Sequence, residues 1–135
     1  MANALYGLGR EKFLTGAIDM AGDTIKAALV DTASYTVSID ADEFFSTVSA
    51  AVVGTPVTLG TKTTALGVFD CADFSFTGLS SAPSIEAIVI YKDTGTASTS
   101  PLIAYIDTAT GLPANAGATQ VNIAVDSGAN KLFKI

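Results

Sequence analysis

Short apolar runs separated by Gly, Ser, Asp and Pro occupy the chain from residue 25 onward, and this pattern constrains the fold most strongly. Runs of this length with turn residues between them are typical of β-strands. Phe74 and Phe76 alternate with polar residues, as do Val121 and Ile123, so each pair shares one face of a strand. Strands are expected at residues 25–30, 35–39, 51–59, 63–69, 73–77, 85–92, 102–107, 119–125 and 131–135.

The number and spacing of these runs predict a mainly β fold, an antiparallel β-sandwich or barrel with one N-terminal helix and one short internal helix. The first helix is expected within residues 4–18, where Leu5, Leu8 and Phe13 have a loosely helical spacing. The second is expected to begin at Asp40, because Glu43 follows three residues later, as in a capping box. A length of 135 residues predicts a single domain, residues 1–135.

Charged residues are scarce, at 15% of the chain against roughly a quarter in a typical domain. The net charge is -6 and the seven basic residues form no cluster, so a nucleic acid is not an expected partner. So few charges indicate that other subunits cover part of the surface, which favours a homo-oligomer; a free surface rich in Thr is the alternative explanation.

The first residues argue against a targeting segment. Arg10, Glu11 and Lys12 precede any long apolar run, so neither a signal peptide nor a membrane anchor is expected. No window of the sequence approaches the roughly 20 apolar residues that a membrane-spanning helix needs. The chain is therefore expected to fold in a cytoplasm, with no membrane as a partner.

Asp93-Thr94-Gly95 is the tripeptide that carries the catalytic carboxylate in aspartic proteases, where two carboxylates share one proton. Here Lys92 precedes Asp93, and a cation at that position depresses the carboxylate pKa instead of splitting a shared pair. A β-hairpin is favoured, with the tripeptide in the turn between residues 85–92 and 102–107. The continuous apolar runs 87–91 and 102–106 predict strands covered on both faces.

Asp-Thr occurs at the edges of four apolar runs. In this dipeptide the Asp side chain accepts a hydrogen bond from a backbone N–H two or three residues on, which suits a strand boundary. The pairs begin at Asp23, Asp31, Asp93 and Asp107.

Other candidate chemistry is weak. The chain has no His, which is the commonest general base. Asp40, Asp42 and Glu43 lack the Gly and the distant Glu of a calcium loop, so helix capping is favoured over a metal. Asp70 and Asp73 are expected in turns, and the single Cys71 beside Asp70 is expected to have a raised thiol pKa. No catalytic, cofactor-binding or metal-binding residue is predicted, and no cofactor.

The segments ALYGLGREKFLTGAIDM, TIKAALVDTASYTV, EAIVIYKDTGTASTSPLIAYIDTATGLP and GANKLFKI carry a resemblance. Together they are similar to a widespread set of small virion-associated proteins encoded by tailed bacteriophages. The resemblance covers most of the chain in order, and residues 46–66 match least well. It implies a structural component of the virion and no enzyme, made in the cytoplasm of the host bacterium.

Within that class, a capsid decoration or cement protein is favoured, with the major capsid protein or other virion proteins as partners. A trimer is expected by analogy with other decoration proteins only. A tail, collar or fibre-attachment component is the alternative. The remote alternatives are a carbohydrate-binding β module, whose usual exposed Trp is absent, and the retroviral-type aspartic protease.

Overall fold

The computed structural model describes residues 3–80, 82–109, 111–125 and 132–134. Its main sheet has five antiparallel strands in the order β1-β8-β7-β2-β3. These strands are β1 (Ala4–Leu5), β2 (Ile25–Val30), β3 (Val52–Thr58), β7 (Ala87–Lys92) and β8 (Leu102–Ile106).

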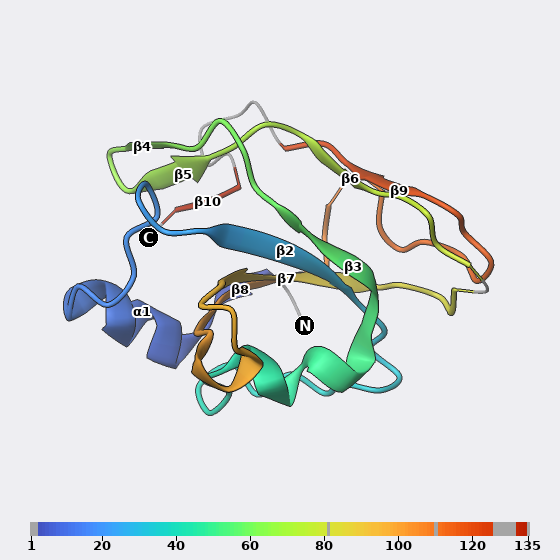
Figure 1. Cartoon of the computed structure of the whole chain (residues 1–135), viewed down its shortest axis with the longest axis horizontal. Coiled ribbons are helices and arrows are strands. Elements are labelled where there is room, and N and C mark those ends of the chain that lie inside the picture. Colours follow the sequence, from blue (N-terminus) through green and yellow to red (C-terminus); the bar gives the residue numbers. More distant parts are fainter. Residues whose placement is uncertain (1–2, 81, 110, 126–131, 135) are drawn as a thin grey trace.

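A second β layer lies above the main sheet in Figure 1 and consists of two smaller antiparallel sheets, β10-β5-β4 and β6-β9. The predicted antiparallel sandwich is confirmed, and the described strands close no barrel. The strands of this layer are β4 (Thr63–Ala65), β5 (Val68–Asp70), β6 (Phe74–Phe76), β9 (Val121–Ile123) and β10 (Phe133–Lys134).

The main sheet is buried on both faces, as the apolar runs 87–91 and 102–106 predict. One face packs against the second β layer through residues such as Ile25, Leu29 and Ile90. The opposite face is covered by helix α1 (Gly7–Leu14) and by two short 3-10 turns, Phe45–Thr47 and Ser49–Ala51 (Figure 1). The chain thus covers its own central strands without a second subunit.

Helix α1 is shorter than predicted, because Ala4 and Leu5 pair with β8 before the helix begins. The helix packs closely on β8 at Gly9, where an added Cβ would lie 2.4 Å from the carbonyl oxygen of Leu102. A side chain at this position would therefore push the helix away from β8.

The predicted strand at residues 35–39 is wrong. The two places beside β2 in the sheet are taken by β3 and β7, so this segment cannot pair with the strand that it follows in the sequence. It passes instead below the sheet, with Tyr35 buried and Val37 packed against the cluster on that face.

The internal helix occurs as the two 3-10 turns, and the predicted cap at Asp40 is wrong. Asp40 lies in a turn ahead of them, and Phe44 and Val48 flank the first 3-10 turn. Asp42 explains the difference, because its carboxylate accepts the backbone N–H of Ser38 and so closes a turn at this point.

The remaining differences concern strand bounds. The predicted strand 63–69 is a hairpin of β4 and β5 with a two-residue connection. The predicted strand 131–135 is observed at Phe133–Lys134, and its two outer residues lie outside the described ranges.

Candidate functional site

Asp93-Thr94-Gly95 lies in the connection between β7 and β8, so the hairpin interpretation is confirmed. The Asp93 carboxylate accepts the backbone N–H of Gly95 at 3.0 Å and pairs with Lys26 at 2.9 Å. The Lys26 hydrogen bond and the Gly95 N–H lower the pKa of Asp93. The carboxylate therefore has an ammonium as its partner, where an aspartic protease has a second carboxylate.

Threonine and serine hydroxyls order this loop. Thr94 Oγ1 lies 2.6 Å from Thr99 Oγ1, and Ser100 Oγ donates to the Thr96 carbonyl at 2.8 Å. Ser100 is buried although it is polar, because its hydroxyl also accepts the Thr94 backbone N–H. These hydroxyl bonds all lie within residues 94–100, while the Asp93 N–H donates to the Thr24 carbonyl at 2.9 Å and so joins the loop to the start of β2.

Two of the other Asp-Thr pairs, at Asp31 and Asp23, differ in their hydrogen bonds. Asp31 accepts the backbone N–H of Ala33, two residues on, as predicted. Asp23 instead accepts the N–H of Asp19 and pairs with Lys92 at 3.1 Å. Burial alone would raise the pKa of Asp23, but this N–H and the Lys92 ammonium lower it. Lys92 therefore acts on Asp23, and Lys26 acts on Asp93.

The acidic residues at 40–43 do not converge. Asp40 lies 4.0 Å from Arg10, and Glu43 pairs with Lys12 at 2.7 Å. Asp42 accepts a hydrogen bond from the Tyr35 hydroxyl at 2.6 Å. Among the described residues, no group of three His, Cys, Asp or Glu side chains is placed to hold a metal ion.

A row of hydrogen-bonded side chains lies buried under the main sheet, and the sequence pattern does not predict it. The hydroxyls of Tyr6 and Tyr35 lie 2.8 Å apart, and Tyr35 donates its proton to Asp42. Tyr6 is therefore the donor to Tyr35. Burial raises the pKa of both phenols, so both stay protonated at neutral pH. These hydrogen bonds, from Tyr6 through Tyr35 to Asp42, hold the segment 35–42 beneath the sheet.

Cys71 is buried, and burial followed by the charges of Asp70 and Asp73 raises its thiol pKa to about 11. The expected direction of this shift is confirmed. Asp73 accepts the backbone N–H of Val125 at 2.7 Å and ties the end of β9 to the start of β6. Cys71 and Asp73 therefore have structural roles, and among the described residues they form no pair that could react together.

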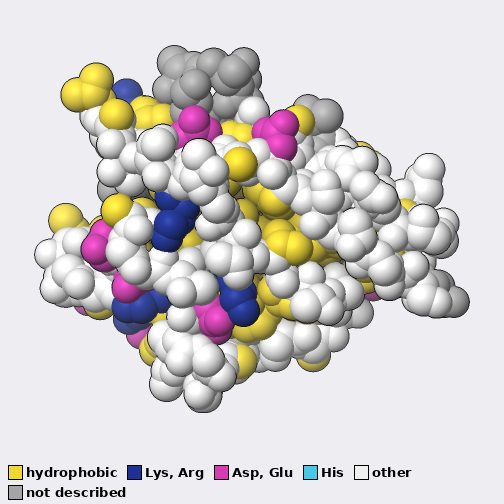
Figure 2. Space-filling view, turned by 45° about the horizontal axis from the view of Figure 1, so that its top comes forward, with side chains coloured by type: hydrophobic (Ala, Val, Ile, Leu, Met, Phe, Trp, Pro, Cys, Tyr) yellow, Lys and Arg dark blue, Asp and Glu magenta, His cyan; other side chains and the backbone are white. Residues whose placement is uncertain are grey.

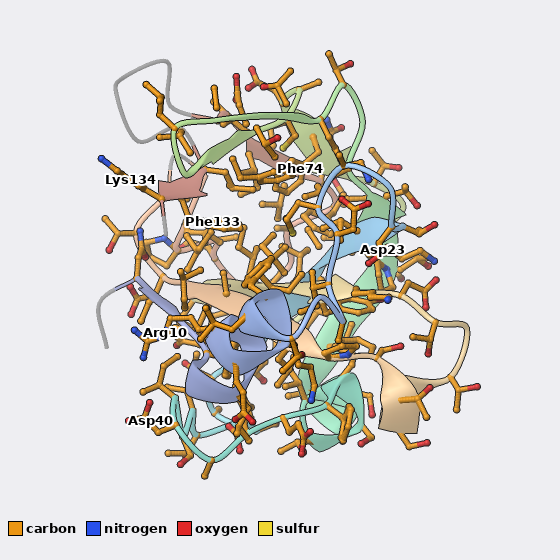
Figure 3. All side chains as sticks on the ribbon, turned by 90° about the vertical axis from the view of Figure 1, so that its left-hand side faces the viewer. Arg10, Asp23, Asp40, Phe74, Phe133 and Lys134 are labelled. Carbon is orange, nitrogen blue, oxygen red and sulfur yellow. The ribbon has the colours of Figure 1, made fainter. Side chains whose placement is uncertain are left out.

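A hollow with a volume of about 1510 Å³ opens between β1, β8 and β10. In Figure 3, Phe133 and Lys134 lie on one side of it and Arg10 and Asp40 on the other. Its floor is mainly apolar, with residues such as Ile106, and the charges lie at its rim. The rim charges are too few and too separate to define a catalytic group.

The β4–β5 hairpin has an unusual tip. Leu66 and Gly67 form its two-residue connection with φ values of 53° and 78°. Positive φ at both positions is typical of a type I′ turn, which favours Asn-Gly. A leucine in this conformation costs about 1–2 kcal/mol. Thr61 also has a φ of 53°, so the two positive-φ non-glycine residues of the described chain flank β4.

Among the described residues Leu66 packs against no core cluster, and it is 96% exposed. Leu14 at the end of α1 is 89% exposed, and all three residues of β4 are exposed. The turn between β4 and β5 and the end of α1 lie at the same end of the molecule, on the left in Figure 1. We name the projecting element, residues 63–70, the β4–β5 hairpin.

A scan against protein-family models and a search of curated proteins both find no match to this chain. None of the described helices is long and apolar enough to cross a lipid bilayer.

Proposed function

We propose that the chain is a structural protein of a tailed bacteriophage particle, a capsid decoration or cement protein that reinforces the head through protein–protein contacts. Two independent features support this proposal. The first is the resemblance, inferred in the sequence analysis from four segments of the chain, to small virion-associated proteins of tailed bacteriophages. The surface carries a strained and exposed leucine at the tip of a projecting hairpin.

Leu66 carries the proposal. Its conformation destabilises the free chain and its side chain is left in water, so neither local geometry nor core packing accounts for leucine at this position. Strained residues that folding does not require are concentrated where proteins bind their partners. An exposed apolar side chain on a rigid turn suits insertion into an apolar pocket of a neighbouring protein.

The geometry also explains how such a contact would reinforce a shell. Burying one leucine side chain stabilises a complex by about 1.5–3 kcal/mol. The turn is already held by the β4–β5 pairing, so little conformational freedom is lost on docking. Many copies docking on a repeated lattice add these contributions, and each docked copy raises the free energy needed to open the shell locally.

The decisive experiment compares virions carrying the parent chain with virions carrying Leu66→Asn. The Asn variant keeps the turn and removes the apolar tip, so fewer copies per particle and earlier release of DNA on heating are expected. Leu14→Gln is a second variant at the same end. Particles with full occupancy and unchanged heat resistance in both variants would contradict cementing through this end.

Copy number in purified virions separates the two positions within the particle. Hundreds of copies per virion support a place on the capsid, and about a dozen or fewer support a tail, collar or fibre attachment. Absence of the chain from purified virions would end the proposal altogether.

A further inference from the structure

The β4–β5 hairpin is fixed to the rest of the molecule more firmly along β5 than along β4. On β5, Phe69 is buried in the core and packs against Phe133, with the ring centroids 5.4 Å apart. β4 is an edge strand of its three-stranded sheet, and all three of its residues are exposed. The tip at Leu66 can therefore swing about β5 unless a contact near the start of β4 prevents it.

The chain turns sharply where it enters β4. The backbone N–H of Ala72 donates to the Gly60 carbonyl at 2.9 Å and fixes the chain up to that residue. Thr61, which follows, has a φ of 53°. A β-branched residue is rarely found in this left-handed region, and such a conformation persists only where the surrounding contacts fix it. Contacts on both sides of Thr61 are therefore needed to hold the turn.

The contact on the far side of Thr61 is made by Lys62. This residue is half-buried, and its ammonium donates to the backbone carbonyl of Asp23, 39 residues earlier in the sequence. The loop that contains Asp23 lies beside the hairpin in Figure 1 and in Figure 3. A surface lysine commonly leaves its ammonium in water, because holding its long side chain in one conformation costs entropy. A specific bond therefore sets the direction of the Lys62 side chain.

Asp23, to which Lys62 binds, is itself held in place. Its carboxylate lies 3.1 Å from the Lys92 ammonium and accepts the N–H of Asp19 at 2.8 Å. The negative charge of Asp23 also attracts the Lys62 ammonium. In Figure 2 basic and acidic side chains gather on the left part of the visible face, at the end that carries the hairpin. The loop before β2 and the end of β7 are thus joined at the residue that Lys62 contacts.

We infer that Lys62 is a positioning residue, whose bond to Asp23 fixes the β4–β5 hairpin against the loop before β2 and so sets the direction in which Leu66 points. As far as docking is concerned, the inference rests on the proposed function. The core holds the hairpin along β5, and Lys62 holds it at the start of β4. A hairpin fixed on both sides loses little freedom when its tip binds, so part of the affinity of Leu66 for a partner depends on Lys62.

Amide hydrogen exchange of the isolated chain tests the positioning role without any partner. Lys62→Met keeps a long side chain and removes the ammonium, so β4 should separate from β5 more often. The amides that pair β4 with β5 should then exchange about tenfold faster or more, while those of β7 stay unchanged. Lys62→Arg keeps a charged donor and should restore slow exchange. Lys134→Met makes the same exchange of side chains on the opposite edge strand, and it should change these amides little.

A double-mutant cycle tests whether the effect of Lys62 passes through Asp23. Asp23→Asn keeps the backbone carbonyl but removes the charge that attracts Lys62. It should speed exchange at the β4–β5 amides in the parent chain and add nothing in Lys62→Met. Unchanged exchange in Lys62→Met, equal acceleration in β7, or additive effects of the two substitutions would overturn the inference.

Occupancy in virions separates failure of the positioning role from failure of the proposed function. If Leu66 docks, Lys62→Met should lower the number of copies per particle and Lys62→Arg should restore it. Full occupancy in both Leu66→Asn and Lys62→Met would refute the docking and leave the exchange results standing. Reduced occupancy in Leu66→Asn alone would contradict the contribution of Lys62 to docking.

Discussion

Replacing Leu66 with Asn should make the isolated chain more stable, although a large apolar residue is exchanged for a polar one. Leu66 has a φ of 53° in the turn between β4 and β5, followed by Gly67. Asn adopts this conformation more readily than any other non-glycine residue, because its short side chain bonds locally to the backbone. The exchange relieves strain at a position that makes no core contact.

The magnitude follows from the geometry. A leucine in the left-handed region costs about 1–2 kcal/mol, and most of that cost should be relieved by Asn. With 96% of the Leu66 side chain exposed, almost no buried apolar area is lost. A gain of about 1 kcal/mol corresponds to a rise in Tm of about 3–4 °C, from an unfolding entropy of about 2.1 cal/mol/K per residue over 135 residues.

Thermal and urea unfolding of the parent chain and of Leu66→Asn measure this change. Leu66→Ala is the matched control, because it removes the same apolar tip but keeps a residue that disfavours positive φ. The control should leave Tm nearly unchanged. If Leu66→Asn lowered the Tm, Leu66 would have a stabilising contact in the isolated chain, and its assignment as a docking residue would lose its physical basis.

Three further predictions concern the rest of the fold. Gly9→Ala should lower stability by about 1–3 kcal/mol in urea unfolding, despite the better helix propensity of Ala, because the Leu102 carbonyl cannot move aside; equal stability would contradict the close packing. Cys71 should not react with a thiol reagent at pH 8 until the chain unfolds, because the thiol is buried and its pKa is about 11; rapid labelling of the folded chain would contradict this. The Lys26–Asp93 pair should add stability that is fully present above about pH 4 and lost as the pH falls through the depressed pKa of Asp93, and Lys26→Met should reduce this acid sensitivity, since only the Gly95 N–H then lowers the pKa; an unchanged pH profile of Tm in Lys26→Met would show that the pair contributes nothing.

Patterns within single segments predicted the central hairpin correctly. The runs 87–91 and 102–106 are apolar at every position, which is typical only of strands covered on both faces, and β7 and β8 are so covered. The segments that cover β7 and β8 could not be predicted from sequence patterns in the same way. The segment 35–39 has the alternation of a strand, but the two places beside β2 are taken by β3 and β7. A short stretch of sequence does not show which distant strands will pair with β2.

The candidate docking residue escaped prediction for a related reason. Residues 63–69 have the β-branched and apolar composition of one strand, and Leu66-Gly67 lacks the Asn or Asp that marks a two-residue turn. The glycine inside a strand pattern was the one available signal of a bend. A residue that breaks local preference for the sake of a partner is hidden from rules that describe folding alone.

The direction of the central strands has a mechanical consequence. In Figure 1, β2 and β7 run along the long axis of the molecule, from the end that carries the β4–β5 hairpin toward the opposite end. Their hydrogen bonds lie across that axis and extend over six residue pairs. Tension applied between the two ends would therefore load these bonds in shear, so that many must break together, whereas a peeling force would break them one after another. A chain anchored at both ends is oriented to resist stretching.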